Sequence, residues 1–395
     1  MTSTSVHARR NILSFVALLI LAANLRPALT TVGPLVSSIQ DATGLSAAAV
    51  GLLSSLPLLA LAAFAPIGNF VRRIGLERIL TVSLVVLFVG ILLRSSGSTF
   101  ALFAGTLVLA AGIAVGNVLG PSLIKRDYPE RVGTVTTIYV LVLALTAAVA
   151  TGLSVPFEKW LPGGWRSSLA IWAIPAGLAA LLWLFMARPS PETPQALSQS
   201  GASTVWRSPL AWSVAVFMGL QSIGFYVVVS WFPKIINDYG YDLTVAAFMV
   251  TCFQLISVAS GAALPKFLAL RDDQRALAVI CSLCIATGAF GMLLYPAWTI
   301  AWVLIAGFGT GVCFPLSIAF IGLRSGDHHQ AAALSVMAQS MGYLLAAGGP
   351  VLFGLARDLS GGWSVPLAAF GFVAVAQAII GYVAGQNRTI STSHS

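Results

Sequence analysis

Charged residues are scarce in this sequence. Charged side chains make up 8% of its 395 residues, whereas hydrophobic residues make up 58%. A soluble globular domain carries about 25% charged residues, and a chain of this length with so few could not cover a surface that faces water. The sequence therefore excludes a soluble globular protein. It predicts a protein with many membrane spans, whose length lies in apolar segments within the lipid bilayer.

Cysteine is scarce as well, and so are groups suited to metal binding or catalysis. The four cysteines all lie inside apolar stretches. Cys281 and Cys284 have a spacing found in metal sites, but no second pair of Cys or His accompanies them. We interpret the cysteines as small buried helix residues. Because no nucleophile–base pair is expected at one membrane depth, the sequence predicts no enzyme, no cofactor and no metal site.

What the sequence has in abundance is apolar segments long enough to cross a bilayer as helices. The first of them, from Ile12 to about Gln40, is expected to form one continuous helix. The approximate limits of the twelve segments are 12–39, 46–70, 79–96, 99–123, 133–156, 167–187, 209–234, 244–268, 275–295, 298–323, 331–356 and 363–386.

The loops between these segments predict the orientation of the chain. Fifteen Lys and Arg residues fall on the side of the N-terminus and five on the other side. Basic residues accumulate in cytoplasmic loops, so both termini are expected in the cytoplasm. The net charge of +9 follows from this bias, and we therefore expect no nucleic-acid partner.

Two similar halves are predicted. Residues 112–115 correspond to 309–312, and 125–127 correspond to 324–327, at an offset of about half the chain. The predicted domains are an N-terminal six-helix bundle at 1–187, a Pro- and Ser-containing cytoplasmic linker at 188–208, and a C-terminal six-helix bundle with a short tail at 209–395. Two pseudo-symmetric bundles of this kind enclose a central site in some transporter folds.

Short motifs carry a resemblance to a known family. The loop from Gly68 to Arg78 resembles the signature Gly-x-x-x-Asp-Arg-x-Gly-Arg of the major facilitator superfamily, with matches at Gly68, Arg73 and Gly75. Arg72 stands where the signature has Asp, and Leu76 where it has the last Arg. The resemblance implies an all-α membrane protein with twelve transmembrane helices, a small-molecule substrate and a monomeric state.

Further motifs resemble one branch of that superfamily. They are Gly116–Pro121 with Ile124–Pro129, Trp206–Trp212, and His329–Ser335 with Met337–Ser340 and Gly342–Ala347. Together they are similar to the cyanate permease branch, which includes proteins assigned as 2-nitroimidazole transporters. This resemblance covers essentially the whole chain and implies a multi-pass protein of the cell inner membrane.

The acidic residues and histidines are absent from the middle of the predicted spans. All twelve acids fall in loops or at helix ends, and the four histidines are terminal or in a loop. Proton-coupled transporters usually hold a titratable group in the membrane interior. Coupling through Tyr, through loop carboxylates or through a proton carried on the substrate stays open.

Arg26 is the exception to this absence of charge, since it lies near the middle of the first segment. A guanidinium has a planar fork of donors suited to carboxylate, nitrate-like or nitro oxygens. We therefore expect the substrate to supply a negative charge or a strong acceptor group that binds Arg26. The alternative interpretation is that Arg26 extends to the interface or bonds backbone carbonyls that Pro27 has freed.

Other polar side chains at mid-depth are expected to share a central cavity with Arg26. The family resemblance places them on helices that form the cavity, whereas each could instead make an interhelical hydrogen bond. The predicted substrate-binding residues are Arg26, Asn24, Asn117, Tyr139, Gln221, Tyr226, Gln254, Gln339 and Tyr343.

The function predicted from these features is secondary active or facilitated transport of a small anionic or nitro-bearing solute, cyanate-like or nitroimidazole-like, by alternating access. An alternative is an exporter of neutral aromatic antimicrobials, with Phe225, Tyr226 and Trp231 as an aromatic wall. A membrane sensor that does not transport is a third possibility.

Overall fold

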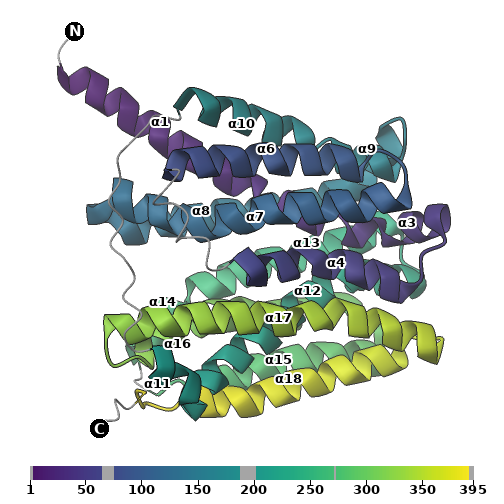
Figure 1. The fold of residues 1–395 in the computed structure, drawn as a ribbon. Helices are drawn as coiled ribbons and strands as arrows, with labels where there is room; N and C mark the ends of the chain where they lie inside the picture. Colours follow the sequence, from purple (N-terminus) through teal and green to yellow (C-terminus); the bar gives the residue numbers. More distant parts are fainter. Residues whose placement is uncertain (1–2, 65–74, 187–201, 271–272, 391–395) are drawn as a thin grey trace. The chain divides into compact units, whose positions relative to one another are not determined.

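The computed structural model describes residues 3–64, 75–186, 202–270 and 273–390, and these ranges contain helices and no strand (Figure 1). Within them, twelve helical segments are long and apolar enough to cross a membrane. The predicted all-α membrane class and the number of spans are confirmed.

The chain divides into two compact units. Unit 1 comprises Met1–Thr31 and Phe64–Pro194, and unit 2 comprises Val32–Ala63 and Gln195–Ser395. Val32–Ala63 belongs to the first six helices by its order in the chain, but its packing in this structure places it with the second six. The division into bundles at 1–187 and 209–395 therefore stays a prediction.

Unit 1 is built around two long neighbouring helices, α6 and α7 (Figure 1). Helix α10 packs against α6, while α1 and α2 pack against α8. Its elements are α1 (Ser3–Asn24), α2 (Pro27–Thr30), α6 (Leu76–Arg94), α7 (Thr99–Asp127), η3 (Pro129–Arg131), α8 (Val132–Trp160), α9 (Trp165–Ala170) and α10 (Ala173–Met186).

Unit 2 is organised around α12, which packs against α13, α16, α17 and α18. Its elements are η1 (Gly33–Leu35), α3 (Val36–Thr43), α4 (Ala47–Phe64), α11 (Ala202–Arg207), α12 (Pro209–Asp238), α13 (Leu243–Ala262), α14 (Leu264–Leu270), α15 (Arg275–Leu294), η4 (Pro296–Trp298), α16 (Thr299–Leu323), α17 (His328–Ser360) and α18 (Ser364–Ala384).

The prediction of one continuous helix over the first segment is wrong. Helix α1 ends at Asn24, and α2 begins at Pro27 after a break at Leu25 and Arg26. A proline has no backbone N–H, and its ring clashes with the carbonyl four residues earlier, so it is favoured at the start of a helix. Pro34 is likewise in the first turn of η1. The first span is therefore assembled from one long helix, α1, followed by three short elements, and Arg26 lies at its first break.

Two predicted segments lie partly outside the described residues. Residues 68–74 of the signature loop fall outside the described ranges, and its described part shows Glu77 paired with Arg126 at the end of α7, 2.7 Å apart. Of the predicted linker at 188–208, residues 188–201 fall outside the described ranges, and Ala202–Arg207 forms the helix α11.

Candidate functional site

The break in the first span presents Arg26. Arg26 is the residue that precedes α2, and its carbonyl accepts hydrogen bonds from the backbone N–H groups of Leu29 and Thr30 at 3.0 and 3.2 Å. Its side chain is partly exposed, whereas its neighbours Leu25 and Pro27 are buried. The interruption of the helix therefore places a cationic side chain at the border of the packed core.

Asn24 has a local role at the same break. Its Nδ2 donates to the carbonyl of Ile20, one turn earlier in α1, at 2.8 Å. The side chain is 5% exposed. A carbonyl near the end of α1 thus gains a side-chain donor where the regular helix stops, so the amide of Asn24 supports the break that presents Arg26.

A second arginine lies beside this break, and the sequence prediction missed it. Arg94, the last residue of α6, was counted among the loop residues, but it is 1% exposed. Its Nη1 donates to the carbonyl of Ala28 at 2.6 Å, and within the described part of the chain its Nε and Nη2 have no hydrogen-bond partner. The signal in the sequence was that Arg94 directly follows an apolar run, with no turn residue before it.

Tyr139 brings α8 to the same region of unit 1. It is 3% exposed, and its hydroxyl has no hydrogen-bond partner among the residues that the structure describes. A Cβ at Gly120 of α7 would collide with that hydroxyl, so glycine is what lets Tyr139 fit there. Helices α1 and α2, on either side of Arg26, both pack against α8, which carries Tyr139. The structure therefore places these two predicted site residues on neighbouring elements of unit 1.

Asn117 in α7 is also in unit 1 and is partly exposed. Its Nδ2 donates to the carbonyl of Ile113 at 3.0 Å, one turn earlier in the same helix. The amide of Asn117 is therefore bonded within α7, and its contact with a substrate stays a prediction.

The remaining five predicted site residues all belong to unit 2. Gln221, in α12, is 1% exposed and donates through Nε2 to Ser222 Oγ at 2.7 Å. Gln339, in α17, is partly exposed and donates to Ser335 Oγ at 2.9 Å. The other three are Tyr226 in α12, Gln254 in α13 and Tyr343 in α17. Their polar groups lie on three helices that pack together in one unit.

The aromatic wall predicted for the alternative function is divided in the structure. Phe225 and Tyr226 are neighbours, with ring centroids 5.2 Å apart, and Phe253 lies 6.2 Å from Phe225. Trp231 belongs to another group, with Phe353 at 6.1 Å and Trp363 at 5.9 Å. The three predicted residues therefore belong to two different clusters.

Groups for metal binding are not assembled in the ranges that the structure describes, where no three His, Cys, Asp or Glu side chains come together. All four cysteines are free thiols in helices of unit 2. The chemistry available around Arg26 and Tyr139 is hydrogen bonding and electrostatic attraction.

The twelve apolar helical segments in the described ranges are those of a multi-pass membrane protein. The chain belongs to the Major Facilitator Superfamily, whose family model matches residues 16–350. It is therefore a multi-pass membrane protein that carries a small molecule, and it is not an enzyme.

Among its relatives, the 2-nitroimidazole transporter of Escherichia coli (strain K12) is 42% identical over 394 residues, which cover 98% of this chain and 99% of that protein. The cyanate transport protein CynX of the same organism is 27% identical over 372 residues, or 92% and 94% of the two chains. These relatives confirm the predicted branch of the superfamily.

The fold is also similar to that of solved transporters. The D-xylose–proton symporter superposes with a TM-score of 0.76 over 94% of this chain and 96% of that chain, at 14% sequence identity. At that identity the similarity concerns the fold alone.

Proposed function

We propose that this chain carries a small anionic or nitro-bearing solute, cyanate-like or nitroimidazole-like, across the membrane by alternating access, with Arg26 in the central cavity. The observation that carries the proposal is the position of Arg26. Its partly exposed side chain lies at the break between α1 and α2, and both of these helices pack against α8, which carries Tyr139.

The chemistry of these two groups favours a planar solute rich in acceptors. A guanidinium donates two parallel hydrogen bonds to paired oxygens, and such charge-assisted bonds are about twice as strong as neutral ones. The Tyr139 hydroxyl is a further donor. A cation within the membrane costs at least about 2.5 kcal/mol, and a bound anion or nitro group offsets part of that cost.

The two relatives support this class of cargo. One is named for 2-nitroimidazole and the other for cyanate, and both solutes are small and planar or linear, with exposed acceptor atoms. We infer that Gln221, Gln254 and Gln339 supply amide groups to the same cavity. Tyr226 and Tyr343 are proposed to complete it.

We infer further that the protein is a monomer in a cell inner membrane with both termini in the cytoplasm. The two predicted six-helix bundles, 1–187 and 209–395, would rock against each other during transport. The Lys and Arg distribution supports the orientation.

Uptake into proteoliposomes tests the role of Arg26. We expect Arg26→Ala to lower the initial rate of 2-nitroimidazole and cyanate uptake by about tenfold or more, since a charge-assisted hydrogen bond contributes roughly 1.5–3 kcal/mol. Arg26→Lys should give an intermediate rate, and Tyr139→Phe a loss of about three- to tenfold. Arg207→Ala, an exposed arginine of α11, is the matched control and should match the wild type.

A thermal-shift measurement with the same ligands separates binding from folding, because a ligand raises stability by RT ln(1 + [L]/Kd). A folded Arg26→Ala protein with unchanged uptake and an unchanged shift would overturn the proposed site.

The contact between Phe225, Tyr226 and Phe253 favours a second candidate function, which is the export of neutral aromatic compounds. It predicts that Phe225→Ala reduces transport of a neutral aromatic solute while Arg26→Ala does not. The reverse pattern supports the anionic or nitro-bearing cargo.

A further inference from the structure

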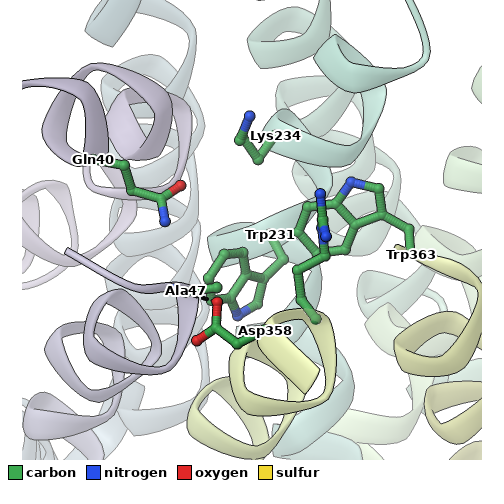
Figure 2. Close-up of a pocket in the computed structure, with 7 residues that line it drawn as sticks. Gln40, Ala47, Trp231, Lys234, Asp358 and Trp363 are labelled. Atoms are coloured by element: carbon green, nitrogen blue, oxygen red, sulfur yellow. Dashed lines mark hydrogen bonds between the residues drawn. The ribbon is translucent and has the colours of Figure 1, made fainter. Parts of the chain in front are cut away.

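One end of unit 2 contains a pocket of about 240 Å³ (Figure 2). It lies where α3 ends, α4 begins, α12 and α17 end and α18 begins. In Figure 2, Gln40 lies across the pocket from Trp363, with Lys234 and Trp231 between them. The predicted topology puts this end of the helices on the side opposite the cytoplasm, where a solute arrives or leaves.

Two acids beside the pocket already have bonding partners within the protein. Asp358 accepts hydrogen bonds from the backbone N–H groups of Ala47 and Ala48 at 3.0 and 2.7 Å, so its charge caps the N-terminus of α4. Asp238, at the edge, forms an ion pair with Lys234 at 2.7 Å and accepts a hydrogen bond from Trp363 Nε1 at 2.9 Å. Both carboxylates therefore have their partners within the protein.

Arg357 is different. Its guanidinium lies over the ring of Trp363, 5.0 Å from the centroid. Within the described ranges it makes no hydrogen bond or ion pair, although it lines the pocket and is only partly exposed. A guanidinium has five N–H donors, and those of Arg357 are available to a solute in the pocket.

The aromatic side of the pocket is held rigidly. Trp231 is 1% exposed and donates its indole N–H to the carbonyl of Pro350 at 3.1 Å. Trp363 is 8% exposed and bonds Asp238. Phe353 stacks on both rings at an interplanar angle of 28°. The two indoles are thus fixed and almost fully buried beneath the pocket, and the ring of Trp363 supports the guanidinium of Arg357.

We propose that this pocket is a second, outer binding site for a small planar organic anion. Arg357 binds the acceptor oxygens of the anion, while the ring of Trp363 beneath it holds the guanidinium in place. The volume lies below the roughly 300–1,000 Å³ of pockets for drug-sized ligands, so it suits one small solute. The choice of anion rests on the proposed function, whereas the site itself rests on Arg357 and the tryptophans.

Equilibrium binding of labelled benzoate to the full-length purified protein tests the proposal, with neutral benzamide as the matched ligand. We expect two benzoate sites in the wild type. Arg357→Ala should weaken the outer site by about tenfold or more and leave the inner one. Arg26→Ala should do the opposite, and Arg207→Ala should change neither. Because the outer site is open to water, its affinity should fall with added salt.

The outcomes separate this proposal from the proposed function. A single site that Arg26→Ala removes and Arg357→Ala leaves unchanged overturns the outer site alone. Binding that Arg357→Ala weakens and Arg26→Ala does not supports the outer site and overturns the proposed inner one. Equal affinity for benzamide at the outer site overturns the requirement for an anion.

A folding defect in Arg357→Ala does not block the test, because Arg357→Gln removes the charge while keeping most of the side-chain length. Arg357→Lys keeps the charge and loses the planar fork. We expect Arg357→Gln to weaken the outer site as strongly as Arg357→Ala, and Arg357→Lys to weaken it by a few-fold. Unchanged outer-site affinity in Arg357→Gln overturns the proposal.

Discussion

Arg26 and Arg94 both lie at the break in the first span, but the environments of their side chains differ. Arg26 is partly exposed and precedes α2. Arg94 is fully buried and donates to the carbonyl of Ala28, the second residue of that four-residue helix. A cation at a helix C-terminus stabilises the carbonyls that lack a backbone donor. Arg94 therefore stabilises α2, the short helix that begins directly after Arg26.

Replacement of Arg94 tests this role. Arg94→Ala leaves a cavity and an unbonded carbonyl at Ala28, which should lower the free energy of unfolding by about 2–4 kcal/mol. Arg94→Lys keeps the charge but loses the fork and should cost less. Arg78→Ala, an exposed arginine at the opposite end of α6, is the control and should stay within about 0.5 kcal/mol. Thermal unfolding in detergent measures all three, and a wild-type value for Arg94→Ala would contradict the role.

At the scale of elements, the contact between α4 and α17 joins segments about three hundred residues apart in the chain. Ser46 Oγ accepts a hydrogen bond from the N–H of Ala49 at 3.2 Å, and Asp358 near the end of α17 adds acceptors for the N–H groups of Ala47 and Ala48, which Ser46 does not bond. A Cβ at Gly354 would collide with the carbonyl of Ala47, so the two backbones approach closely there. The N-terminus of α4 is thus fixed by a tertiary contact.

Loss of this cap should loosen α4 locally. Asp358→Ala removes both acceptors for Ala47 and Ala48, and we expect a loss of about 0.5–2 kcal/mol with faster hydrogen exchange at these two amides. Asp41→Ala, an exposed acid on the neighbouring α3, should leave their exchange unchanged. Equal exchange rates in Asp358→Ala and the wild type would show that α4 does not depend on the cap.

At the scale of the whole molecule, the distribution of acids leads to a prediction about whether transport is coupled to protons. In the described ranges, the acids lie at helix ends or in loops, as in Glu77 at the start of α6 and Asp127 at the end of α7. Arginine keeps its charge at any accessible pH and cannot carry a proton through the cycle. Proton movement should therefore accompany the solute only when the solute itself carries the proton.

Proteoliposomes that contain a pH-sensitive dye test this expectation. Uptake of nitrate, which stays charged at all working pH values, should leave the lumen pH unchanged beyond the leak of protein-free liposomes. Uptake of a weak acid should acidify the lumen in proportion to the protonated solute carried. A clear proton flux with nitrate would reveal a titratable group in the transport path that the sequence prediction missed.

The sequence by itself determined the class of this protein, the number of spans, the branch of the superfamily and the unusual position of Arg26. Hydropathy and motif patterns are local properties of the chain, and the insolubility of charge in lipid makes them decisive for a membrane protein. The same local reasoning failed at Pro27, where the expected helix is broken, because a proline inside a span can either bend a helix or start a new one.

Only the tertiary structure decided which polar side chains meet. It packed α8, which carries Tyr139, against the helices on both sides of Arg26, buried Arg94 against Ala28, capped α4 with Asp358 and placed Arg357 over the ring of Trp363. Each of these contacts joins residues on different helices. The apolar pattern of a span states that a side chain lies in the membrane, but not which neighbouring helix it faces, because that depends on helix packing across the whole unit.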